Sequence, residues 1–63
     1  MRLTEFWRRM EAHFGPAYAH SVALDHRLTS LGSTIDEALR NGVDAKTVWR
    51  AVCAEFEVSK DLR

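Results

Sequence analysis

The sequence predicts an all-α fold, a compact bundle of four helices in a single domain over residues 1–63. Apolar residues recur at spacings of three and four, which places them on one face of a helix. No stretch alternates apolar and polar residues as a half-buried strand does. Gly and Pro occur only where one helix is expected to give way to the next. A chain of 63 residues suffices for one small core.

The first helix is expected over about residues 5–14, after a cap at Thr4. Its apolar residues fall on one stripe: Leu3, Phe6, Trp7, Met10 and Phe14. Gly15 ends this helix, because glycine readily takes the positive φ of a helix terminus. Pro16 suits the first position of the next helix, where its missing N–H costs nothing. Gly15 and Pro16 are therefore predicted to be structural residues.

The second helix is expected over about residues 16–31, with Gly32 after its end. Its apolar set is Val22, Leu24, Leu28 and Leu31. The short third helix is expected over about residues 35–41, after a cap at Ser33 or Thr34.

The fourth helix is expected over about residues 45–57, with a short tail after it. Asp44 is a good N-cap, because its carboxylate accepts from free backbone N–H groups of the first turn. Gly42 permits the tight turn before it. The apolar stripe of this helix comprises Val48, Trp49, Val52 and Phe56, with Ala45 and Cys53 beside it. We expect Trp49 to be more than half buried.

The last two helices resemble the helix-turn-helix of bacterial repressors over residues 34–53. The shared pattern is a small residue, a turn glycine, an apolar residue, a cap and a Thr-Val pair: Ala38, Gly42, Val43, Asp44 and Thr47-Val48. The resemblance implies that base edges would be read by Ala45, Lys46 and Arg50. It implies that phosphates would be contacted by Thr47 and Trp49.

Two features of the sequence depart from a DNA-reading helix. Trp49 is large and apolar where a small polar residue is usual. Residues 44–57 hold two basic side chains against three acidic ones, a net charge of −1, whereas a helix that enters a groove is normally basic. The other interpretation is that this geometry simply joins two helices at a sharp angle.

The charge of the whole chain is balanced. Nine Lys and Arg residues face nine Asp and Glu residues, so there is no global positive field to hold a phosphate backbone. A local basic patch would still favour nucleic acid if five side chains converged: Arg8, Arg9, Arg40, Lys46 and Arg50. Scattered, solvated charge is the alternative.

The residue types of common catalytic and metal sites are present without the necessary spacing. His13, His20 and His26 lie seven and six residues apart, whereas a helical ligand pair needs three or four. Cys53 is the only cysteine, which excludes a disulfide within the chain, and we expect it to be a small buried residue. We therefore expect no metal, no cofactor and no enzymatic activity.

Nothing in the sequence indicates a membrane or a secretory segment. The first ten residues lack an apolar core of signal-peptide length. No apolar run approaches the ~18 residues of a membrane span. We therefore expect a soluble cytoplasmic protein.

Three blocks of sequence, "TEFW", "FGPAYA" and "KTVWRAVC", give the chain a second resemblance. It is similar nearly end to end to a family of small actinobacterial proteins that is described only as a domain of unknown function. Members are often encoded near the recombinase RecA and its regulator RecX, which implies a link to DNA recombination or repair. The family supplies no catalytic residues to transfer.

We accordingly expect a protein-interaction module accessory to recombination or repair, whose partner is another protein. A small helix-turn-helix DNA-binding protein is the alternative, with weak binding to nucleic acid. No membrane partner is expected, and the protein is expected to be a monomer or a small homo-oligomer. The candidate contact residues are Lys46, Arg50, Ala45, Thr47 and Arg40.

Overall fold

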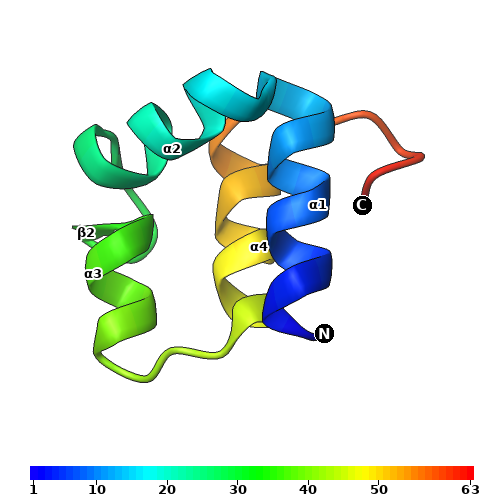
Figure 1. Cartoon of the computed structure of the whole chain (residues 1–63). Coiled ribbons are helices and arrows are strands. Elements are labelled where there is room, and N and C mark those ends of the chain that lie inside the picture. The colour runs from blue at the N-terminus through cyan, green and yellow to red at the C-terminus, as the bar shows by residue number, and fades with distance from the viewer.

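A computed structural model describes all residues from 1 to 63 and contains four helices and a two-stranded antiparallel sheet. The helices are α1 (Leu3–Phe14), α2 (Pro16–Asp25), α3 (Ile35–Arg40) and α4 (Ala45–Glu55). The strands β1 (Arg27–Leu28) and β2 (Ser33–Thr34) pair Arg27 with Thr34 and Leu28 with Ser33. In Figure 1, α1 and α4 stand side by side, α2 crosses over their upper ends, and α3 lies on the far side of α4 from α1.

The mainly helical fold is confirmed, but the prediction of a strictly all-α fold is wrong at the end of α2. This helix ends at Asp25, six residues before the expected end at residue 31, and the β-hairpin follows. The reason is tertiary. The Glu55 carboxylate on α4 accepts from the Thr29 N–H at 3.2 Å and lies 2.9 Å from His26 Nε2. These contacts hold residues 26–29 in a non-helical path.

The apolar set expected in this segment is only partly buried. Leu24 was expected in the core, but 61% of it is exposed, because α2 turns Ala19, Val22 and Ala23 inward instead. Leu28 is fully buried as expected, but it reaches the core from the strand β1 and not from a helix. Gly32 closes the hairpin with a φ of 68°, and its N–H donates to the Leu28 carbonyl at 2.8 Å.

The cap predicted at Thr4 is wrong, because α1 already begins at Leu3, without a side-chain cap bond. The other predicted caps and turn residues are confirmed. Gly15 has a φ of 88° and ends α1, and Pro16 is the first residue of α2. Thr34 forms a capping box with Glu37 at the start of α3. The Asp44 carboxylate accepts from the N–H groups of the first turn of α4. Local side-chain caps therefore fix where α3 and α4 begin.

The turn between α3 and α4 has the features that the sequence predicted. It comprises residues 41–44, Gly42 has a φ of 88°, and the Val43 N–H donates to the Ala38 carbonyl at 3.0 Å. Figure 1 shows α3 and α4 running in opposite directions on either side of the connecting loop. The two helices of a helix-turn-helix cross at about 90–120°. Because the opposite directions of α3 and α4 do not establish such a crossing, the helix-turn-helix stays a prediction.

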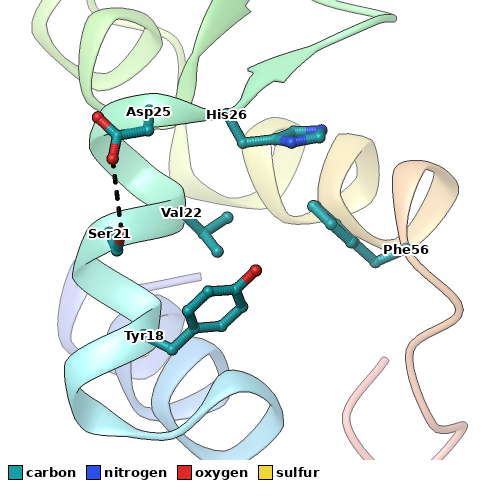
Figure 2. Close-up of a pocket in the computed structure, with 6 residues that line it drawn as sticks. All are labelled: Tyr18, Ser21, Val22, Asp25, His26 and Phe56. Carbon is teal, nitrogen blue, oxygen red and sulfur yellow. Dashed lines mark hydrogen bonds between the residues drawn. The ribbon is translucent and has the colours of Figure 1, made fainter.

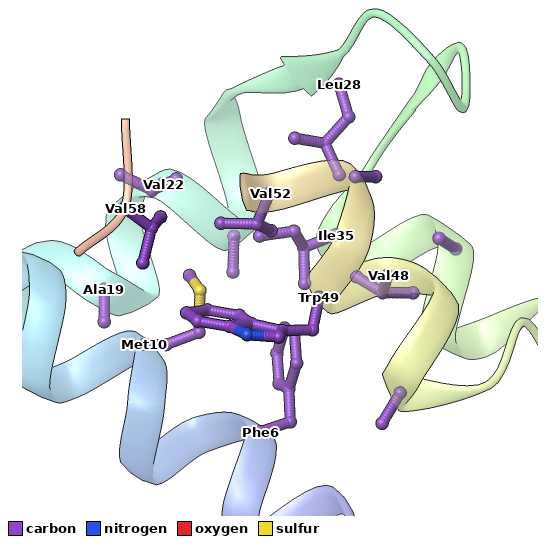
Figure 3. Close-up of a cluster of buried hydrophobic side chains, with 14 residues drawn as sticks. Phe6, Met10, Ala19, Val22, Leu28, Ile35, Val48, Trp49, Val52 and Val58 are labelled. Atoms are coloured by element: carbon purple, nitrogen blue, oxygen red, sulfur yellow. The ribbon is translucent and has the colours of Figure 1, made fainter. Parts of the chain in front are cut away.

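One hydrophobic core of 14 buried residues lies between the helices (Figure 3). Trp49 lies near its centre and is 2% exposed, which confirms its predicted burial. Its ring packs edge-on against Phe6, with the ring centroids 6.0 Å apart. Its Nε1–H donates to the Leu62 carbonyl at 3.0 Å. Val58 is also buried, so the tail closes one side of the core.

The helices of this chain are short. None of them combines the length and the apolar character that a helix needs to cross a bilayer.

Candidate functional site

Two exposed cations, Lys46 and Arg50, occupy one face of α4. They lie four residues apart, so their side chains are neighbours on the helix surface. The Asp44 cap sets where α4 begins, and the opposite face of α4 is buried through Val48, Trp49 and Val52. The orientation of the two cations is thus a consequence of the cap and of the apolar stripe.

Two other parts of the chain add cations beside this face. Arg9 comes from the middle of α1, and Arg63 comes from the folded tail. Together they border a surface hollow of about 360 Å³, which we call the basic hollow; its lining residues are Met1, Arg9, Lys46, Trp49, Arg50 and Arg63. The tail is fixed there by the bond from Trp49 to the Leu62 carbonyl and by the bond from Arg63 Nε to the Val58 carbonyl at 2.9 Å.

Arg9 is the one cation of the basic hollow that has an acidic partner. Its Nε donates to Glu5 at 2.8 Å, and its Nη1 donates to the main-chain oxygen of Arg63 at 3.2 Å. Hydrogen bonds from Arg8 and then Arg9 lower the pKa of Glu5 to about 2. Glu5 is therefore ionised at neutral pH and offsets charge on α1.

Three cations of the basic hollow remain without an acidic partner. Lys46, Arg50 and Arg63 form no ion pair with any Asp or Glu of the chain. Like charges held close together repel one another, and an anion placed among them relieves that repulsion. The arrangement is chemically suited to binding a localised anion.

Cys53 lies next to this region and is only partly buried, less than expected. Burial raises the pKa of its thiol, and the positive charges of Arg63 and Arg9 oppose that effect without reversing it. The thiol is therefore mainly protonated at neutral pH and is a poor nucleophile. Its contribution is packing against the core.

The structure brings together only part of the predicted contact set. Ala45 is 8% exposed and belongs to the core, so its side chain does not reach a partner. The Thr47 hydroxyl donates to Asp44 at 2.6 Å and serves the cap. Of the five-residue patch considered from the sequence, Arg9, Lys46 and Arg50 converge, whereas Arg8 pairs with Glu5 and Arg40 lies elsewhere. Sequence reasoning missed Arg63, because a tail carries no local signal of where it folds.

Arg40 lies in a second polar hollow of about 310 Å³, which we call the compensated hollow; it is lined by Arg27, Gly32, Ser33, Glu37, Arg40 and Asn41. The side chain of Arg40 is 77% exposed and is 3.0 Å from Asp36. Arg27 Nη1 donates to the Gly32 carbonyl at 2.8 Å. Hydrogen bonds from the Thr34 N–H and then its hydroxyl lower the pKa of Glu37, with smaller effects from Arg27 and Arg40.

A third recess, of about 200 Å³, separates α2 from the end of α4. Figure 2 shows the Tyr18, Val22, His26 and Phe56 side chains on one side of α2, while Ser21 and Asp25 bond to each other at 3.4 Å on the other side. The recess is small, and its six lining residues are Tyr18, Ser21, Val22, Asp25, His26 and Phe56. Sequence reasoning missed it, because it exists only where α2 ends early.

The three histidines are engaged separately. The His20 ring stacks on Trp7 with the centroids 4.9 Å apart, and the His13 ring contacts Phe14 edge-on. His26 lies beside Glu55. No three His, Cys, Asp or Glu side chains are grouped so that they could hold a metal ion.

Residues 1–61 match the model of the family described as "Protein of unknown function (DUF3046)". The chain belongs to this family. That description names no activity, ligand or partner. No curated protein and no solved structure matches the chain.

Proposed function

We propose that the protein is a small protein-interaction module of the cytoplasm, accessory to DNA recombination or repair, which holds its partner at the basic hollow. The observation that carries this proposal is the group of three cations, Lys46, Arg50 and Arg63, that surround a hollow without an acidic partner. The resemblance to proteins encoded near RecA and RecX supports the recombination part. The proposed working unit is a monomer or a small homo-oligomer, with no enzymatic activity.

The backbone that carries the three cations of the basic hollow is fixed before a partner arrives. Lys46 and Arg50 stand on a helix whose start is fixed by Asp44. Arg63 is tied to the tail by its own bond to Val58. Arg63 therefore loses less conformational entropy on binding than a free side chain would, whereas the partner must order the side chains of Lys46 and Arg50.

A small helix-turn-helix DNA-binding protein is the second candidate. Lys46 and Arg50 favour it, because both are exposed on α4, at positions where the repressor resemblance implies base contacts. The balanced charge of the chain and the net negative charge of residues 44–57 oppose it. If DNA is bound, we expect the binding to be weak and to depend on these two side chains.

The test is affinity capture from a lysate of the source cells, with and without nuclease treatment. Three baits are compared: the unmodified protein, Lys46→Ala/Arg50→Ala, and the control Arg27→Ala/Arg40→Ala. The control removes the same charge from the compensated hollow. Circular dichroism establishes that each bait is folded.

We expect a protein that is captured by the unmodified bait and by the control, is lost with Lys46→Ala/Arg50→Ala, and survives nuclease. Capture that both double variants retain would place the partner on another surface and would refute the proposal. Capture that disappears with nuclease would favour the DNA-binding candidate instead.

A further inference from the structure

We infer that the basic hollow binds a short acidic segment of a partner protein, through Asp and Glu carboxylates that it sets among Lys46, Arg50 and Arg63. This inference rests on the proposed function and deepens it, because it states the chemistry of the partner. Every residue that it requires already borders the hollow.

The donors come from separate parts of the chain and surround one concave space. Lys46 and Arg50 come from α4, and Arg63 comes from the tail. Arg9 comes from α1, and its charge is partly neutralised by Glu5. Arginine presents its N–H groups as a planar fork that matches a carboxylate with two parallel bonds. Arg50 has its whole guanidinium free for such a pair, because it makes no side-chain hydrogen bond or ion pair within the chain.

Two carboxylates, Asp44 and Glu5, lie beside residues that line the hollow, and this favours a short anionic segment over a nucleic acid. The Asp44 carboxylate accepts from the Lys46 N–H at 2.9 Å, and Glu5 lies 2.8 Å from Arg9. Duplex DNA carries about one charge per 1.7 Å of its axis. A duplex laid across the hollow would bring phosphates close to these carboxylates, whereas a short peptide segment can confine its charge to the hollow.

The Trp49 indole offers a direct reporter of binding. It lines the hollow, and its Nε1–H bonds to the residue that precedes Arg63. Trp7, the only other tryptophan, does not line the hollow and stacks on His20. In a proton–nitrogen NMR spectrum the two indoles give separate signals, which a Trp7→Phe variant assigns. The Trp7 signal is thus an internal control.

The experiment titrates the full chain with a short oligo-Glu peptide, an oligo-Gln peptide of equal length, and a random-sequence DNA duplex. It is repeated with Lys46→Ala/Arg50→Ala and with the control Arg27→Ala/Arg40→Ala. We expect oligo-Glu to shift the Trp49 indole signal and leave that of Trp7 in place. The affinity should fall about tenfold or more in Lys46→Ala/Arg50→Ala, because charge-assisted bonds are lost, and should not change in the control.

Three outcomes would overturn the inference: no shift with oligo-Glu, an equal response to oligo-Gln, or equal weakening in both double variants. Tighter binding of the duplex than of oligo-Glu at the same salt would also overturn it. If oligo-Glu fails while the captured protein still depends on Lys46 and Arg50, the inference fails and the proposed function stands. If the capture does not depend on Lys46 and Arg50 either, both the inference and the proposed function are refuted.

Discussion

The basic hollow and the compensated hollow are similar in size, and both contain arginines, yet their charges are balanced very differently. In the compensated hollow, Arg40 pairs with Asp36, and Arg27 is bonded to a backbone carbonyl near the Glu37 carboxylate. In the basic hollow, Lys46 and Arg50 have no acidic partner.

This difference teaches that a count of basic residues is a poor guide to an anion site. The nine basic and nine acidic residues cancel over the whole chain. They do not cancel locally, because each ion pair forms between residues that the fold or the helix spacing brings together. What indicates a site is a hollow lined by several cations that the folded chain leaves without a counter-charge.

The largest expected effect on stability comes from truncating Trp49, the buried aromatic residue that lines the basic hollow. Trp49→Ala should lower the free energy of unfolding by about 3–5 kcal/mol, since it deletes a buried ring and leaves a cavity. Stability of about 0.05–0.15 kcal/mol per residue is usual, so a chain this short should lose most of its folded population. Urea unfolding followed by circular dichroism measures this. A midpoint equal to that of a Trp7→Phe control would contradict the burial argument.

The next effect concerns the turn that places α4, and with it the basic hollow. Gly42→Val should destabilise the fold by about 1 kcal/mol or more, because Gly42 has a φ of 88° and a β-branched residue resists that region. A Cβ at this position would meet nothing within 4 Å, so the effect comes from the backbone alone. Gly42→Asn is the matched control, since Asn tolerates positive φ better. Equal unfolding midpoints for the two variants would refute this explanation.

Most helix ends were predictable from local rules, although the cap expected at Thr4 does not form. The caps at Thr34 and Asp44 and the positive φ of Gly15 follow from side-chain chemistry that acts within one turn of chain. The end of α2 was not predictable in this way. It depends on Glu55, which lies 26 residues away from its hydrogen-bond partner Thr29, and no window of neighbouring residues contains that contact.

A smaller loss of stability should appear at acidic pH, and it involves Glu37, which lines the compensated hollow. The pKa of Glu37 is lowered in the folded protein by its bonds from Thr34. A carboxyl group with a lowered folded pKa stabilises the fold above its unfolded pKa of about 4.3, and this stabilisation is lost as the pH falls through the folded value. The urea concentration at the unfolding midpoint should therefore decrease as the pH is lowered below about 4. The decrease should be less steep in Glu37→Gln. An equal pH dependence for that variant would show that Glu37 does not contribute.

The smallest effect on stability should come from the basic hollow itself. Lys46→Ala/Arg50→Ala should leave the unfolding midpoint unchanged or raise it slightly, because no internal ion pair is lost and alanine favours helix. Arg27→Ala/Arg40→Ala should lower the free energy of unfolding by at most about 1 kcal/mol, since surface pairs contribute little. Thermal unfolding of the two variants compares them directly. A large loss for Lys46→Ala/Arg50→Ala would mean that these cations serve the fold.

The candidate site was only partly predictable. Lys46 and Arg50 could be placed on one exposed face of a helix, because a cap and an apolar stripe fix that face. The basic hollow around them could not, because Arg9 and Arg63 are 54 residues apart in the chain and meet only through tertiary packing. The pairing of Arg40 with Asp36, at a helical spacing of four, was accessible in principle and removes Arg40 from the contact set.

The central claim, that the basic hollow holds uncompensated charge and the compensated hollow does not, is tested most directly by anion-linked stability. Melting temperatures are measured with inorganic phosphate and with chloride at equal ionic strength, for the unmodified protein and both double variants. An anion that binds only the folded state raises the melting temperature, whereas the general effect of phosphate on hydrophobic burial acts on all three proteins alike. We predict an added rise for the unmodified protein and for Arg27→Ala/Arg40→Ala, and none for Lys46→Ala/Arg50→Ala. The same rise in all three proteins would contradict the account.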